Sequence, residues 1–113
     1  MPDYRYLYES LKGTRMEQGH LTIRGFESDS DYQELYYTLL EELAPVIHDN
    51  YPYWFNRQLA AYYRFNRAKS RSYQLFDPFQ GRDCEQMTVR EQLVVLKFYL
   101  YRRYYSSYKT KGA

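Results

Sequence analysis

A row of arginines at helical spacing is the most distinctive chemical feature of this 113-residue sequence. Arg57, Arg64 and Arg71 are seven residues apart, and Arg67 lies between the last two. Seven residues make almost two turns of an α-helix, so these side chains are expected to project from one face. Guanidinium groups bind carboxylate and phosphate oxygens through paired hydrogen bonds. The spacing therefore predicts a surface for an acidic partner, either a protein or a nucleic acid.

Two simpler interpretations compete with a binding surface. The arginines could form only a solvated face, or they could pair with carboxylates of a neighbouring helix such as Glu34 and Glu41. Residues 1–50 carry four basic and ten acidic side chains, a net −6, whereas residues 51–113 carry twelve and four, a net +8. This asymmetry favours packing of one half against the other, although it also suits an acidic partner or head-to-tail association of copies.

A second candidate surface lies in the stretch LVVLKFYLYRRYYSSY, residues 93–108. Its end is rich in tyrosine and arginine, residue types that anchor protein interfaces. The candidate binding residues are Tyr101, Arg102, Arg103, Tyr104, Tyr105 and Tyr108. Tyrosine accounts for 16 of the 113 residues, more than a small core needs, so some rings are expected at the surface. The alternative is that tyrosine replaces Leu and Phe in an ordinary core.

Catalytic chemistry is not predicted, so we expect a non-enzymatic protein. Asp77, Glu85 and Lys97 are the residue types of a nuclease site, but such a site needs strands to hold it, and none is predicted there. Glu41 and Glu42 are adjacent carboxylates. On a helix they point about 100° apart, which suits a solvated face better than acid–base catalysis.

Metal, cofactor and membrane sites are not predicted either. His20, His48, Asp49 and Cys84 lack the spacing of metal ligands, and no cofactor motif is present. The single cysteine has acidic neighbours that would raise its pKa, which favours a structural thiol in the reducing cytoplasm. The start MPDYRYLYES lacks the features of a signal peptide, and the longest apolar stretch, around residues 93–101, is too short to span a membrane.

The first half of the chain predicts two helices and an ambiguous segment between them. Apolar spacing predicts a helix over residues 3–12 that docks through Tyr4, Leu7, Tyr8 and Leu11. Residues 14–26 are expected to form a loop or a short β-hairpin closed near Gly19. A capping box of Ser30 with Gln33 predicts the start of a second helix, and Pro45 is expected to end it.

The second half predicts two longer helices that carry the candidate residues. The third is expected over residues 53–73, with its apolar face opposite the arginines. A loop is expected around residues 77–87. Thr88 and Glu91 form a second capping box, which predicts a fourth helix to about Tyr108. This helix has two apolar faces, so it is either the central helix of the fold or a homodimer interface over residues 88–108.

The sequence thus predicts a mainly α, single-domain bundle of about four helices covering residues 1–113. We expect a small interaction or regulatory protein that binds a protein partner, for example an accessory factor or inhibitor of nucleic-acid machinery from a phage or mobile element. The alternative is a protein that binds DNA or RNA directly, with arginine on the phosphates and tyrosine stacked on bases. No helix-turn-helix or other reader motif can be placed to support that alternative.

Overall fold

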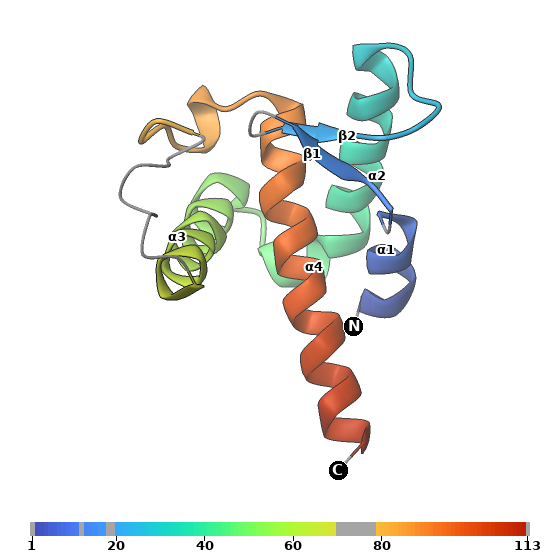
Figure 1. The fold of residues 1–113 in the computed structure, drawn as a ribbon, viewed down its shortest axis with the longest axis vertical. Coiled ribbons are helices and arrows are strands. Elements are labelled where there is room, and N and C mark those ends of the chain that lie inside the picture. Colours follow the sequence, from blue (N-terminus) through green and yellow to red (C-terminus); the bar gives the residue numbers. More distant parts are fainter. Residues whose placement is uncertain (1, 12, 18–19, 70–78, 113) are drawn as a thin grey trace.

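The computed structural model describes residues 2–11, 13–17, 20–69 and 79–112, without the side chains of residues 16–17, 20, 67–69 and 107–112. Its elements follow the chain in the order shown in Figure 1. They are α1 (Tyr4–Ser10), β1 (Arg15–Glu17), β2 (His20–Thr22), α2 (Asp29–Ile47), α3 (Tyr51–Lys69), the 3₁₀ helix η2 (Cys84–Gln86) and α4 (Val89–Gly112). The prediction of a mainly α fold with about four helices is confirmed.

Helix α4 is the central element. It lies between α3 on one side and α1 and α2 on the other, and the hairpin crosses its first half (Figure 1). Leu93, Val94, Leu96 and Leu100 are buried on different sides of the helix. Both apolar faces are therefore covered by the chain itself up to residue 100, as the central-helix interpretation predicted. The C-terminal turns of the helix project away from the other elements (Figure 1).

Helix α1 docks as predicted, through buried Leu7 and Leu11 with Tyr4 and Tyr8 half-buried beside them. It ends at Ser10, slightly earlier than expected.

The ambiguous segment is a β-hairpin, with antiparallel β1 and β2. The proposed turn residue Gly19 lies outside the described residues. Two basic side chains of α4 hold the hairpin: Arg90 donates to the Leu21 carbonyl oxygen and to Thr22 Oγ1, both at 3.0 Å, and Lys97 Nζ donates to Thr14 Oγ1 at 2.8 Å. These tertiary bonds stabilise a pair of strands that is marginal alone.

The predicted start of α2 was two residues too late. The helix is capped at Ser28, and the Asp31 carboxylate accepts the backbone N–H groups of Glu27 at 3.0 Å and Ser28 at 3.2 Å. These bonds hold the pKa of Asp31 below its usual value. The proposed box of Ser30 with Gln33 fails because Ser30 is already inside the first turn, where its backbone is helical.

The prediction that Pro45 ends α2 was wrong. The helix continues to Ile47 and ends at His48, which has a left-handed φ of 57°. Pro45 has no backbone N–H to donate to the Glu41 carbonyl oxygen. Pro45 and Glu41 are both exposed, so water can bond to that oxygen instead. The additional residues of the helix bury Ile47, which helps to offset the lost bond.

Helix α3 begins two residues earlier than predicted, and its described part ends at Lys69. Asn50 Oδ1 accepts the backbone N–H of Tyr53 at 3.3 Å, and Pro52 is tolerated because the first turn lacks helical acceptors for its N–H groups. The predicted extension of the helix to Tyr73 lies outside the described residues.

The predicted loop before α4 contains η2 and is tied to the start of that helix. Arg82 donates to the Phe79 and Gln86 carbonyl oxygens and forms a bidentate ion pair with Glu91. The capping box is confirmed, since Thr88 Oγ1 accepts from Glu91 N at 3.1 Å and Glu91 Oε1 accepts from Thr88 N at 2.9 Å. Desolvation raises the pKa of Glu91, but the hydrogen bonds from Arg82 and Thr88 together hold it below its usual value.

Candidate partner-binding face

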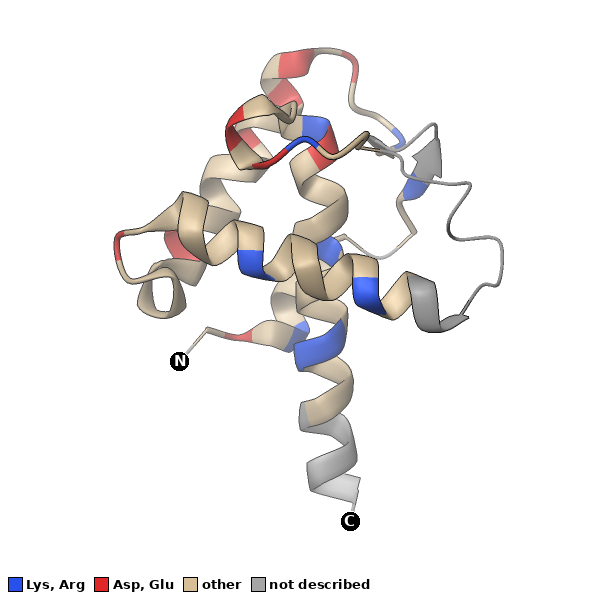
Figure 2. Cartoon of the chain, turned by 90° about the vertical axis from the view of Figure 1, so that its left-hand side faces the viewer, with Lys and Arg blue, Asp and Glu red and all other residues tan. Residues whose placement is uncertain are grey.

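Four of the predicted arginines lie exposed on one face of the molecule. Arg57 and Arg64 come from α3, and Arg102 and Arg103 come from the C-terminal half of α4. Figure 2 shows basic segments along α3 and on α4 below it, whereas acidic segments gather mainly at the end of the molecule away from the C terminus. We call these four residues the basic face. The Arg67 side chain and Arg71 lie outside the described part of the chain.

Aromatic packing holds together the two helices that carry the arginine pairs. The ring of Trp54 lies 4.9 Å from that of Tyr99, in an edge-to-face arrangement. The ring of Phe98 lies 5.4 Å from Tyr62 and 5.1 Å from Phe65. Such pairs are favourable beyond the area they bury, so the relative position of the two helices is well defined.

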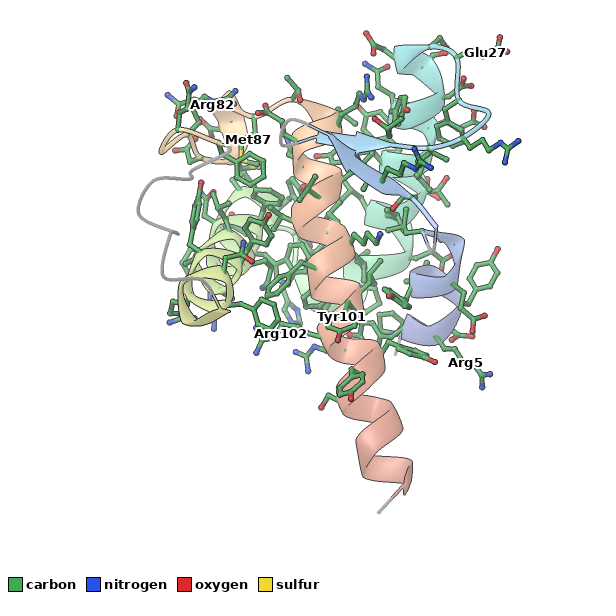
Figure 3. The ribbon with its side chains drawn as sticks, viewed as in Figure 1. Arg5, Glu27, Arg82, Met87, Tyr101 and Arg102 are labelled. Carbon is green, nitrogen blue, oxygen red and sulfur yellow. The ribbon has the colours of Figure 1, made fainter. Side chains whose placement is uncertain are left out.

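A small cleft lies between these helices. It has a volume of about 220 Å³ and is lined by Gln58 of α3 and by Tyr99, Arg102, Arg103 and Ser106 of α4. We call it the α3–α4 cleft. The Arg102 guanidinium carbon lies 5.6 Å from the centre of the Phe98 ring, and that of Arg103 lies 5.5 Å from the Tyr99 ring. Figure 3 shows Arg102 on the α3 side of α4.

Internal ion pairing does not account for the basic face. Among the described residues the ion pairs are Arg5 with Glu9 and Arg82 with Glu91. The suggested pairing with Glu34 and Glu41 is therefore not observed for Arg57 and Arg64, the two arginines of this row whose side chains the structure describes. A solvated face and a binding surface both remain consistent with this geometry.

The predicted tyrosines have different environments. Tyr104 is half-buried and stacks on Tyr8 of α1, with ring centres 5.1 Å apart. Tyr101 and Tyr105 stack on each other at 5.7 Å and are 37% and 45% exposed. The Tyr108 side chain lies outside the described residues. Tyr101 also packs on Tyr8, with ring centres 5.8 Å apart, so Tyr105 and the exposed part of Tyr101 offer surface to a partner, whereas Tyr104 packs mainly within the fold. A homodimer through residues 88–108 stays a prediction.

Among the residues whose side chains the structure describes, those weighed for catalysis or metal binding are not assembled into a site. Glu85 is exposed on η2, Lys97 is bonded to Thr14, and Asp77 lies outside the described residues. Within the described ranges, no group of three or more His, Cys, Asp or Glu side chains is placed to hold a metal ion. In the same part of the chain, no helix has the length and apolarity needed to cross a bilayer.

Sequence reasoning missed a polar cluster in the core around Gln92. Gln92 Oε1 accepts the hydroxyls of Tyr36 at 2.8 Å and Tyr51 at 2.7 Å. Its amide nitrogen donates to the carbonyl oxygens of Cys84 at 3.2 Å and Met87 at 3.0 Å. The signal in the sequence was a single amide directly before the apolar run of α4. Every polar atom of the side chain is bonded, so the cluster joins α2, α3, η2 and α4.

Burial keeps the tyrosine hydroxyls of the core and the Cys84 thiol protonated at neutral pH. Desolvation is the main cause that raises the pKa of Tyr36, Tyr51 and Tyr62 above the usual value. Desolvation, with charge repulsion from Asp83 and Glu85, raises the pKa of Cys84 to about 11. The thiol therefore remains protonated and is a poor nucleophile.

We expect cooperative unfolding at alkaline pH. Unfolded tyrosines lose their protons near pH 10, whereas the buried hydroxyls keep them, so the folded state binds more protons and its stability falls as pH rises above about 10. Tyrosinate absorbance and far-ultraviolet circular dichroism, followed together, are expected to show these hydroxyls ionising only as helix is lost. Complete ionisation of all tyrosines with the helical signal intact would contradict this prediction.

The chain matched no protein-family model, no curated protein sequence and no solved structure in the three comparisons.

Proposed function

We propose that this chain is a non-enzymatic interaction protein that binds an acidic segment of a protein partner through the basic face. The observation that carries the proposal is the arrangement of four exposed arginines from two helices on one side of the molecule. Two of them lie over aromatic rings beside a cleft. Exposed Tyr101 and Tyr105 add contact area at a low cost in conformational entropy.

Preorganisation supports this proposal. A free arginine loses rotamer freedom when it binds, which costs about 0.5–1.5 kcal/mol per side chain. Arg102 and Arg103 lie over Phe98 and Tyr99, and Arg57 lies 5.9 Å from the Tyr53 ring, so part of that freedom is already lost. Arginine and tyrosine are also the residue types that most often dominate binding energy.

Direct nucleic-acid binding is the alternative. The basic face would contact phosphates, and the exposed tyrosines would stack on bases. The overall charge of only +2 and the acidic residues on the rest of the surface favour a protein partner with a limited acidic segment. A regulatory factor or inhibitor acting on nucleic-acid machinery in the cytoplasm fits such a role, and it requires no active site of its own.

Selection from a random peptide display library tests the proposal, because such a library needs no identified partner. We expect the selected peptides to be acidic and to bind more weakly as salt is raised. Charge reversal of Arg57, Arg64, Arg102 and Arg103 to glutamate is expected to reduce their affinity by about 100-fold or more, since each lost charged contact is worth roughly 1 kcal/mol and like charges then repel.

The matched control reverses two exposed arginines near the hairpin, Arg15→Glu with Arg24→Glu, and is expected to change affinity by less than about threefold. Selected peptides without acidic residues, or binding unaffected by the four reversals, would refute the proposal. A gel shift of a DNA or RNA oligonucleotide at low salt, lost on the same reversals and stronger than any peptide binding, would establish the nucleic-acid alternative instead.

A further inference from the structure

We propose that the α3–α4 cleft binds a phosphate monoester carried on a side chain of the partner protein. This inference rests on the proposed function and specifies the group that anchors the partner. The cleft presents two guanidinium groups from consecutive residues, Arg102 and Arg103, and the side-chain amide of Gln58 from the facing helix. Each of these groups can donate hydrogen bonds to oxygen.

The charge of the cleft matches a phosphate monoester better than a carboxylate. None of the described residues that line the cleft is acidic, so the two guanidinium charges are not neutralised within it. A phosphorylated serine, threonine or tyrosine carries about −1.5 to −2 charges at neutral pH. A carboxylate carries one, so it would leave one guanidinium uncompensated in a site beside aromatic rings. Paired hydrogen bonds from arginine to phosphate oxygens are also among the stronger ones in proteins.

The cleft is built on two packed helices, which fixes the backbone positions of its donors. Tyr99 lines it and is held by Trp54 at 4.9 Å and by a 3.3 Å hydrogen bond between the Tyr99 and Tyr4 hydroxyls. Arg103 lies against the ring of Tyr99 and Arg102 against that of Phe98. The phosphate would therefore meet a site that needs little reorganisation, which favours affinity.

The volume of the cleft suits a single phosphate group better than a whole small molecule. Its volume of about 220 Å³ is below the range of about 300–1,000 Å³ typical of pockets that enclose a whole small molecule. A nucleotide base and sugar would remain outside. Phosphodiesters of DNA or RNA carry only one charge each, so a nucleic acid gains less from two adjacent arginines than a monoester does.

Binding of a blocked Ala-phosphoserine-Ala peptide, measured by isothermal titration calorimetry at low salt, tests the inference. We expect it to bind at least about tenfold tighter than the same peptide with aspartate or with unmodified serine at the centre. Trp54, the single tryptophan, packs against a residue of the cleft, so its fluorescence is expected to change on binding.

The decisive variant is Arg102→Gln with Arg103→Gln, which is expected to lower affinity for the phosphopeptide at least about tenfold. Gln58→Glu, made on the other helix, is expected to weaken binding by charge repulsion. The matched control is Arg15→Gln with Arg24→Gln, which is expected to leave affinity unchanged. Circular dichroism and urea midpoints of each variant are to be compared with those of the parent protein to check that it is folded.

Equal affinity for the three peptides, or phosphopeptide binding that survives the loss of both cleft arginines, would overturn the inference. An oligonucleotide that binds the cleft arginines more tightly than the phosphopeptide would overturn it too and would favour nucleic acid as the ligand. The proposed function is tested independently of this inference. Acidic peptides selected by display that bind the basic face would uphold the proposed function even if the cleft bound the phosphoserine peptide no more tightly than the other two peptides.

Discussion

Replacing Gln92 with leucine is expected to destabilise the fold by about 3–4 kcal/mol, because it leaves several buried polar groups without partners. Gln92 is 7% exposed and bonds to the hydroxyls of Tyr36 and Tyr51 and to the carbonyl oxygens of Cys84 and Met87. Leucine fills similar space but offers no hydrogen bond. Urea denaturation followed by circular dichroism measures the change.

Removing the Tyr36 and Tyr51 hydroxyls, which donate to Gln92, is a second test of the same cluster. Tyr36→Phe and Tyr51→Phe are each expected to cost only about 1 kcal/mol, since the Gln92 oxygen keeps one donor. Combining both with Gln92→Leu is expected to cost less than the sum of the three single changes, because an apolar side chain then faces apolar rings. The matched control, Gln33→Leu at an exposed position of α2, is expected to change stability by less than about 0.5 kcal/mol. A Gln92→Leu variant as stable as the parent would show that the cluster is not needed.

The largest expected effect of a core truncation is at Phe55 of α3. Its side chain is 0% exposed and its ring lies 5.6 Å from that of Tyr51. Phe55→Ala removes buried apolar surface and leaves a cavity, so we expect a loss of about 3–5 kcal/mol. The measurement is again the free energy of unfolding in urea. Because α3 carries Gln58, Arg57 and Arg64, a weakened α3 is also expected to weaken peptide binding to the basic face.

Tyr53→Ala on the same helix is the matched control for Phe55→Ala. Tyr53 is 63% exposed, so its truncation is expected to change stability by less than about 0.5 kcal/mol. Equal effects of the two substitutions would mean that α3 does not pack through the face that the structure shows. The contrast therefore tests the docking of the helix and separates it from helix propensity, since both substitutions introduce alanine.

The location of the basic face also bears on self-association. Copies that associated head to tail would place acidic segments of one molecule on the arginines of another. Such association would compete with the acidic peptides, so solution mass should be measured at the salt concentration used for binding. Tyr101 and Tyr105 in the C-terminal half of α4 are exposed and accessible to a second copy.

The sequence by itself determined those features that depend on neighbouring residues. The stripe of Leu7 and Leu11 predicted how α1 docks, and the Thr88–Glu91 capping box was correct because both bonds are made within one turn. The exposed positions of Arg57 and Arg64 also followed from helical periodicity alone. Local patterns failed at the start of α2, where Ser28 and Ser30 were both possible N-cap residues. They also failed at its end, where the helix continues past Pro45 and buries Ile47.

Only the tertiary structure decided which distant residues meet. Gln58 is far along the chain from Arg102 and Arg103, and the three line one cleft because the aromatic side chains of α3 and α4 pack together. Tyr36 and Tyr51 reach Gln92 only when α2 and α3 close around α4. Periodicity assigns a side chain to a face of its own helix, but it contains no information on which other helix covers that face. The packing of the helices decides it, and so determines which side chains meet in the α3–α4 cleft and in the cluster around Gln92.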